Sequence, residues 1–99
     1  MARISFDHEA VAHFCKKQHI HKFALFGSVL RDDFGPDSDV DVLVEFEPGA
    51  KVGLFDISGM ELELSPLFGG RKVDLRTLQD LGRHMRDRVS ASAEGVYAA

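Results

Sequence analysis

Residues 40–46 (VDVLVEF) alternate between valine or phenylalanine and other side chains, and this alternation constrains the fold more than any other feature of the sequence. A period of two is that of a β-strand with one face toward the core. The expected inward face consists of Val40, Val42, Val44 and Phe46, and the opposite face of Asp39, Asp41, Leu43 and Glu45. The chain must therefore build a sheet around this strand.

The residues before this strand predict a helix and a second strand. Asp7 can cap a helix from about His8 to Gln18. One face of that helix would carry Val11, Phe14, Cys15 and Gln18, which recur at helical spacing. The apolar run Phe23–Phe26 then indicates a buried strand that ends at the turn Gly27-Ser28, after which Ser28 could cap a short helix over Val29–Asp32.

The residues after it predict another helix and a short strand. Apolar spacing favours a helix over Leu54–Leu64 that Pro66 must bend or end. The residues that give this spacing are Leu54, Ile57, Met60 or Glu61, and Leu64. After the turn at Gly69-Gly70, residues Lys72–Arg76 (KVDLR) read as a strand with Asp74 opposite its apolar face.

The last quarter of the chain predicts a final helix and an edge strand. Thr77 opens a helical stretch that is interrupted at Gly82 and resumes with Met85 and Val89 on one side. Residues 95–97 can add a strand at the edge of the sheet. Helices thus alternate with strands, which predicts an α/β or α+β fold with a small mixed β-sheet covered by helices.

Length and composition limit the classes of protein. The chain has 99 residues and one cysteine, so we expect a single domain over residues 1–99 without an internal disulfide. The N-terminus lacks the apolar segment of a signal peptide, and no apolar run could span a membrane, which predicts a cytoplasmic protein without membrane contact. The net charge of −4 argues against direct nucleic-acid binding.

Asp39 and Asp41 are the strongest candidates for chemistry. At positions i and i+2 of a strand they lie on the same face, about 7 Å apart by the rise per residue. Two carboxylates next to an apolar strand are costly unless a cation neutralises them. Because the expected ligands are all oxygens, Mg²⁺ or Mn²⁺ fits better than zinc.

A phosphate site is expected beside this pair. Gly27 lets the backbone approach a phosphate, and the Ser28 hydroxyl with free N–H groups supplies donors. Asp74 becomes a third carboxylate if its strand pairs beside residues 40–46. Carboxylates, one or two metal ions and a phosphate cradle are the components of metal-assisted nucleotidyl transfer.

Each of these features also has a simpler interpretation. Aspartates at a solvated strand end are common, Gly-Ser is an ordinary turn, and Asp74 could pair with Arg71 or Arg76. An EF-hand is excluded because its required glycine and glutamate are absent after Asp37. Six basic residues form a solvated helix face or a docking surface: Arg71, Lys72, Arg76, Arg83, Arg86 and Arg88.

Together the motifs resemble a known family. Gly27-Ser28, ten intervening residues, Asp39-x-Asp41 and a later Asp74 in a VDL strand are similar to the minimal nucleotidyltransferase (MNT) domains of the DNA-polymerase-β-like superfamily. The resemblance is greatest to those that act as antitoxins beside HEPN-domain ribonuclease toxins. It runs from about Phe23 to Thr77. It implies the polymerase-β-like nucleotidyltransferase fold.

The resemblance also implies site residues and an activity. Gly27 and Ser28 would bind the nucleoside triphosphate, Asp39, Asp41 and Asp74 would hold metal, and Asp74 would also assist deprotonation of the acceptor. Arg31 would have a phosphate or structural role. The implied reaction is Mg²⁺-dependent transfer of AMP from ATP to a tyrosine of the cognate HEPN toxin, with which the chain would form a hetero-oligomer.

Two other functions remain open from the sequence. The domain could neutralise its partner by binding alone, with Arg83 and Arg86 in the contact. It could instead act on a small molecule such as an aminoglycoside. The short segment after the last predicted strand leaves little chain for a lid, which favours an acceptor that brings its own surface.

Overall fold

The computed structural model describes residues 4–30, 34–35, 37–77 and 80–98. Its elements, in chain order, are α1 (His8–Lys17), β1 (Ile20–Phe26), the 3₁₀ turn η1 (Gly27–Leu30), β2 (Val40–Phe46), α2 (Leu54–Leu64), the 3₁₀ turn η2 (Ser65–Phe68), β3 (Val73–Thr77), α3 (Arg83–Ser92) and β4 (Glu94–Ala98).

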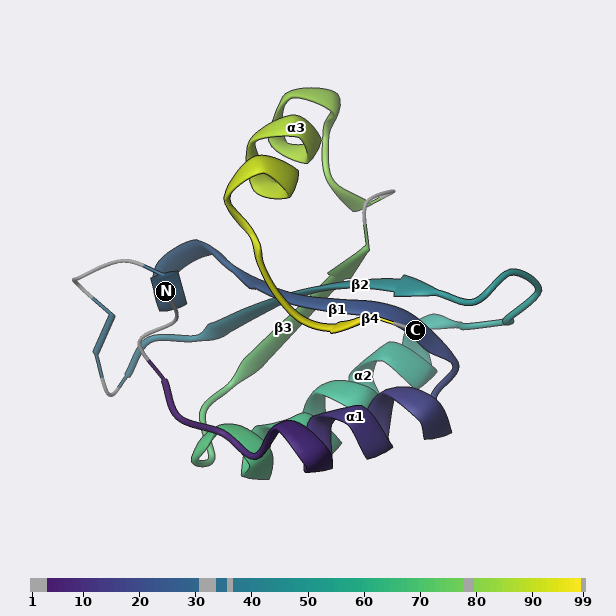
Figure 1. Ribbon diagram of the computed structural model, residues 1–99, viewed down its shortest axis with the longest axis horizontal. Coiled ribbons are helices and arrows are strands. Elements are labelled where there is room, and N and C mark those ends of the chain that lie inside the picture. Colours follow the sequence, from purple (N-terminus) through teal and green to yellow (C-terminus); the bar gives the residue numbers. More distant parts are fainter. Residues whose placement is uncertain (1–3, 31–33, 36, 78–79, 99) are drawn as a thin grey trace.

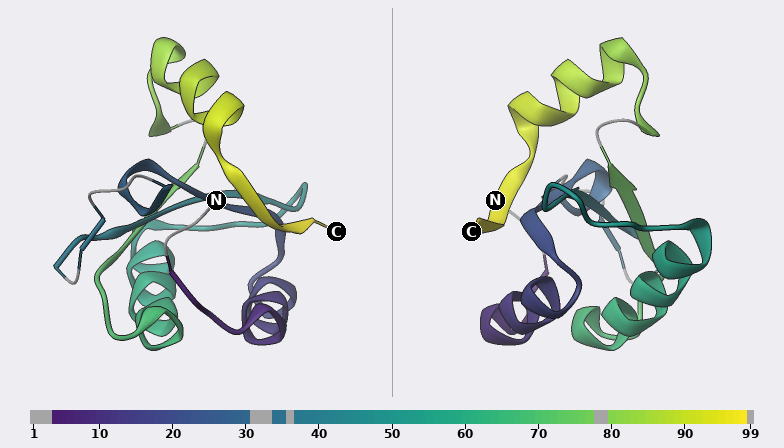
Figure 2. Two further views of the ribbon diagram at one scale, coloured as in Figure 1. Left: turned by 60° about the vertical axis from the view of Figure 1, so that its left-hand side comes forward. Right: turned by 90° about the vertical axis from the view of Figure 1, so that its right-hand side faces the viewer.

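The four strands form one mixed sheet in the order β3-β2-β1-β4. β1 pairs antiparallel with β2 and β4, and β2 pairs parallel with β3. Helices α1 and α2 lie side by side on one face of this sheet, and α3 stands on the opposite side (Figure 1, Figure 2). The expected fold class, a small mixed sheet covered by helices, is confirmed.

The core lies between the sheet and the pair α1 and α2. The alternation in β2 works as expected, because Val40, Val42 and Val44 are buried while Asp41 and Leu43 are only half-buried. In α1 the predicted stripe Val11, Phe14 and Cys15 is buried. Asp7 caps this helix by accepting hydrogen bonds from the backbone N–H groups of Glu9 and Ala10, as the sequence predicts.

Helix α2 has the predicted bounds, and the residues of its apolar spacing differ in burial. Met60 and Leu64 are buried, whereas Leu54 is 86% exposed. Leu54 lies in the first turn of α2, which borders a cavity described below. The apolar spacing therefore predicts the helix correctly, while its first residue lies outside the core.

The segment after β3 also differs from the expectation. Thr77 does not open a helix but ends β3, where it pairs with Val44. Its backbone N–H and its hydroxyl both donate to the carboxylate of Asp80. The helix begins at Arg83, after Gly82, and Val89 is buried as predicted. The predicted edge strand near the C-terminus is confirmed as β4.

In the part of the chain that the structure describes, no helix has the length and apolar character needed to cross a bilayer.

Candidate nucleotide and metal site

The parallel pairing of β2 with β3 places two of the candidate carboxylates next to each other. Asp41 lies directly opposite Asp74 in the register, and both are half-buried. The sequence alone made this pairing conditional on β3 lying beside β2, and the structure meets that condition. Asp39 directly precedes β2 and is also half-buried.

Gly27 belongs to the same site. It follows β1 with a positive φ of +73°, a backbone conformation that L side chains rarely adopt. A Cβ built on Gly27 would lie 2.3 Å from Oδ2 of Asp41. Only glycine allows this backbone to approach the carboxylate so closely, so the turn and the aspartate form one unit.

The side chains of two further predicted site residues lie outside the described part of the structure. Ser28 lies in η1, but its side chain is outside the described part of the structure. Arg31 lies wholly outside the described residues. Their expected roles at the phosphates therefore stay predictions.

The carboxylates of this site fit a metal ion that is also bound by the phosphates of a nucleotide. Among the residues described, no three His, Cys, Asp or Glu side chains come together as a metal site. Mg²⁺ is commonly held by one or two carboxylates together with substrate phosphates rather than by a complete protein cage. The adjacent carboxylates of Asp41 and Asp74 are consistent with this kind of site.

The simpler interpretation of Asp74, an ion pair with a nearby arginine, finds no support. Arg71 donates instead to the backbone carbonyl of Gly35, and its guanidinium lies 4.5 Å from the centre of the Phe34 ring. Within the described ranges, Asp74 forms no ion pair with Arg71 or Arg76.

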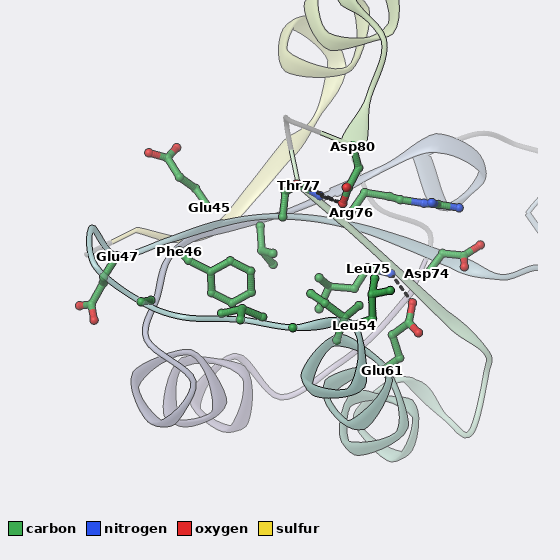
Figure 3. A pocket seen from close by; sticks show the side chains of 15 residues that line it. Glu45, Phe46, Glu47, Leu54, Glu61, Asp74, Leu75, Arg76, Thr77 and Asp80 are labelled. Carbon is green, nitrogen blue, oxygen red and sulfur yellow. Dashed lines mark hydrogen bonds between the residues drawn. The ribbon is translucent and has the colours of Figure 1, made fainter.

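A cavity of about 900 Å³ extends from Asp74 along the end of the sheet, and the sequence analysis missed it. Its walls come from the end of β2, from β3, from α2 between Leu54 and Glu61, and from the loop between β2 and α2 (Figure 3). Asp74, Arg76 and Glu61 lie toward one side of this lining, and Glu45 and Glu47 toward the other (Figure 3). The cavity depends on residues distant in sequence, so no local pattern indicates it.

Cys15 takes no part in this site. It is fully buried in α1, and burial raises the pKa of its thiol to about 12. The thiol therefore stays protonated at neutral pH, which confirms its expected place in the core.

Comparison with known proteins identifies the family. The protein family described as "Nucleotidyltransferase domain" matches residues 9–96. The chain therefore belongs to this family. A relative from Methanocaldococcus jannaschii, named "Putative protein adenylyltransferase", is 31% identical over 80 residues, which are 81% of this chain and 83% of the relative. The chain is thus a nucleotidyltransferase.

Solved structures agree on the fold. One described as a "putative minimal nucleotidyltransferase" is 35% identical with a TM-score of 0.70, over 87% of this chain and 85% of the other. A toxin-antitoxin structure with AMP-PNP has a TM-score of 0.75 at 15% identity, over 94% of this chain and 74% of the other. The structure of the toxin-antitoxin MntA-HepT has a TM-score of 0.67 at 14% identity, over 93% of this chain and 70% of the other. At such low identity, the last two show the fold alone.

Proposed function

We propose that this chain is a Mg²⁺-dependent protein adenylyltransferase that transfers AMP from ATP to a tyrosine hydroxyl of a HEPN toxin and so acts as its antitoxin. The observation that carries the proposal is the unit formed by Gly27, Asp41 and Asp74 at the ends of three elements. It combines close backbone approach with adjacent carboxylates, in a chain of the nucleotidyltransferase family.

The residues have distinct roles in this reaction. The backbone at Gly27 and the hydroxyl of Ser28 bind the triphosphate, with Arg31 as a further phosphate contact. Asp39 and Asp41 hold the metal, and Asp74 completes its ligands. The metal ion, when bound, neutralises charge on the phosphates as the leaving group departs.

Asp74 also acts on the acceptor. The acceptor oxygen forms a bond to the α-phosphorus of ATP, and the bond from that phosphorus to the oxygen bridging to the β-phosphate breaks. Pyrophosphate leaves with the electron pair, and the hydroxyl proton passes to the Asp74 carboxylate. The absence of an ion pair at Asp74, within the described residues, is consistent with this role.

A protein acceptor is supported by the relatives. The M. jannaschii relative is named as an adenylyltransferase of proteins, and several structures with this fold are toxin-antitoxin complexes. Those names describe the other proteins. They make a toxin the first acceptor to test here.

The test is intact-mass spectrometry of a HEPN partner co-expressed with this chain. We expect the partner to gain the mass of one or more AMP units with the wild-type chain and none with Asp39→Ala/Asp41→Ala. Asp74→Asn, which keeps the side-chain shape, should reduce the transfer rate at least about 100-fold while the chain still binds Mg²⁺-ATP. Asp87→Asn, on exposed α3, is the control and should transfer normally.

An unmodified partner held in a tight complex would contradict adenylylation. It would support a second candidate function, neutralisation by binding alone. That candidate is favoured by the exposed apolar side chains Leu54, Phe55 and Leu62 on α2.

A further inference from the structure

We infer that Arg71 is a positioning residue, which holds Asp39 in place for the metal ion that binds with a nucleotide. This inference rests on the metal and nucleotide roles proposed above, and it is independent of the acceptor. Arg71 lies outside the motifs that predict the site. The sequence predicts for it only an ion pair with Asp74 or a place on a basic surface, and the structure gives its guanidinium a different position.

The backbone around Arg71 is fixed at the start of β3. The Ser65 hydroxyl donates a hydrogen bond of 2.7 Å to the Arg71 carbonyl. The backbone N–H of Val40 donates one of 2.9 Å to the carbonyl of the next residue, Lys72. Val40 is the first residue of β2 and pairs with Val73. Because β2 and β3 run parallel, Arg71 lies at the end of the sheet where β2 begins.

From this position the guanidinium reaches the loop that precedes Asp39. Its Nη1 donates to the backbone carbonyl of Gly35, and its Cζ lies 4.5 Å from the centre of the Phe34 ring. Arg71 and both loop residues are half-buried. A hydrogen bond from a charged group and a cation–π contact both become stronger when they are shielded from water. One side chain thus holds two adjacent residues of the loop.

Gly35 connects Arg71 to the residue before Asp39. The backbone N–H of Gly35 donates a hydrogen bond of 3.0 Å to the Ser38 hydroxyl, and the Gly35 carbonyl accepts one of 3.1 Å from the backbone N–H of Ser38. The same carbonyl therefore accepts hydrogen bonds from both Ser38 and Arg71. Asp39 directly follows Ser38, so the position of its backbone depends on this turn.

Asp39 needs such support more than the other two carboxylates. Asp41 and Asp74 lie within β2 and β3 and face each other in the register, whereas Asp39 precedes β2 and follows the turn. A carboxylate on a loop loses more conformational freedom on binding an ion, unless its backbone is already fixed. Side chains that orient metal ligands typically change metal affinity 10- to 100-fold when they are replaced. The contacts of Arg71 fix the Asp39 backbone in this way.

The test is isothermal titration calorimetry of the full chain with Mg²⁺ and a non-hydrolysable ATP analogue. Arg71→Met keeps the apolar stem but removes the guanidinium, and should weaken binding at least about tenfold. Arg71→Lys keeps the charge and should still weaken binding at least about threefold, because an ammonium cannot replace the planar group on the Phe34 ring. Phe34→Leu should weaken binding with no change in charge. Lys16→Met, exposed on α1, also removes one positive charge and should bind normally.

A spectroscopic measurement separates positioning from stability. With Mn²⁺ in place of Mg²⁺, the electron paramagnetic resonance spectrum of the complex with the analogue depends on the coordination geometry of the ion. We expect Arg71→Met to change this spectrum in the same direction as Asp39→Asn, and Lys16→Met to leave it unchanged. Urea unfolding of each variant without ligand measures its stability.

Three results would overturn the inference. The first is wild-type affinity in Arg71→Met. The second is full recovery of affinity in Arg71→Lys, because this would show that the charge of Arg71 matters and its contacts do not. The third is a loss of stability with an unchanged Mn²⁺ spectrum. If Arg71→Met does not fold, Arg71→Lys and Phe34→Leu decide by the same criteria.

The outcomes also separate this inference from the proposed function. If Arg71→Met binds Mg²⁺ and the analogue like the wild type while the wild-type chain adenylylates its toxin, the inference is wrong and the proposed function stands. If the variants behave as expected and no protein is adenylylated, the role of Arg71 stands and the proposed transfer fails. A wild-type chain that binds neither Mg²⁺ nor the analogue would overturn both.

Discussion

At the scale of single residues, Gly27 connects the phosphate turn to the carboxylates. Its positive φ and the closeness of its backbone to Asp41 are two separate requirements for glycine. An alanine at position 27 could adopt the positive φ at the cost of backbone strain. Its Cβ, however, would lie 2.3 Å from Oδ2 of Asp41, so the Asp41 side chain would have to move. One substitution thus affects the conformation of the turn and the metal ligand together.

We therefore expect Gly27→Ala to destabilise the protein by about 1–2 kcal/mol and to abolish Mg²⁺-ATP binding. Urea unfolding and isothermal titration calorimetry measure the two effects. Gly59→Ala is the matched control, because Gly59 lies inside α2 and a Cβ there would meet nothing within 4 Å. That variant should be more stable by about 0.5–1 kcal/mol and bind normally. Normal nucleotide binding by Gly27→Ala would contradict the assigned role of the turn.

At the scale of elements, α2 has two different apolar faces. Met60 and Leu64 pack into the core, while Phe55 and Leu62 are 96% and 77% exposed. Phe55 and Leu62 are seven residues apart, so they lie on one side of the helix about two turns from each other. Large exposed apolar side chains that share a helix face are typical of a contact surface.

We expect Phe55→Ser and Leu62→Ser each to weaken the complex with the partner toxin at least about tenfold while the unfolding midpoint stays within experimental error. Surface plasmon resonance with immobilised toxin measures the affinity. Lys16→Ser, an exposed change on α1, should leave the affinity unchanged. A loss of stability in the two variants, rather than of affinity, would show that these side chains contribute to folding instead.

The elements also show where local patterns suffice. Helix α1 follows from the Asp7 cap and from the apolar face at positions 11, 14 and 15. Strand β2 follows from the alternation of apolar and other side chains over residues 40–46. Capping and side-chain periodicity are both local properties of the sequence. The sequence predicts that Thr77 opens a helical stretch. Its pairing with Val44 on another strand placed it in β3, and sequence spacing does not reveal such a contact.

At the scale of the whole molecule, the core couples the ionisation of Cys15 to folding. Burial raises the pKa of the folded thiol from its ordinary value of about 9 to about 12. In the unfolded chain the thiol loses its proton at lower pH, so the stability it contributes is complete below about pH 9 and is lost as the pH rises toward 12.

We expect Cys15 to resist iodoacetamide at pH 8 in the folded protein and to react fully in urea. Mass spectrometry measures the alkylated fraction. Without urea, the rate of alkylation should follow the rate of unfolding. Urea unfolding from pH 8 to pH 10.5 should show stability falling across that range, and Cys15→Ala should remove the part of the fall due to the thiol. Rapid alkylation of the native protein would contradict the buried position.

The alternating strand, the capped first helix and the Gly27-Ser28 and Asp39-x-Asp41 motifs follow from the order of residues, because each depends on neighbours in the chain. The adjacency of Asp41 and Asp74, the contact of Gly27 with Asp41 and the cavity walls follow only from the packing of β1, β2, β3 and α2. Asp41 and Asp74 are 33 positions apart in the sequence, and Gly27 and Asp41 are 14 positions apart. Their geometry depends on strand register, which is settled when the sheet and its helices bury their apolar faces together.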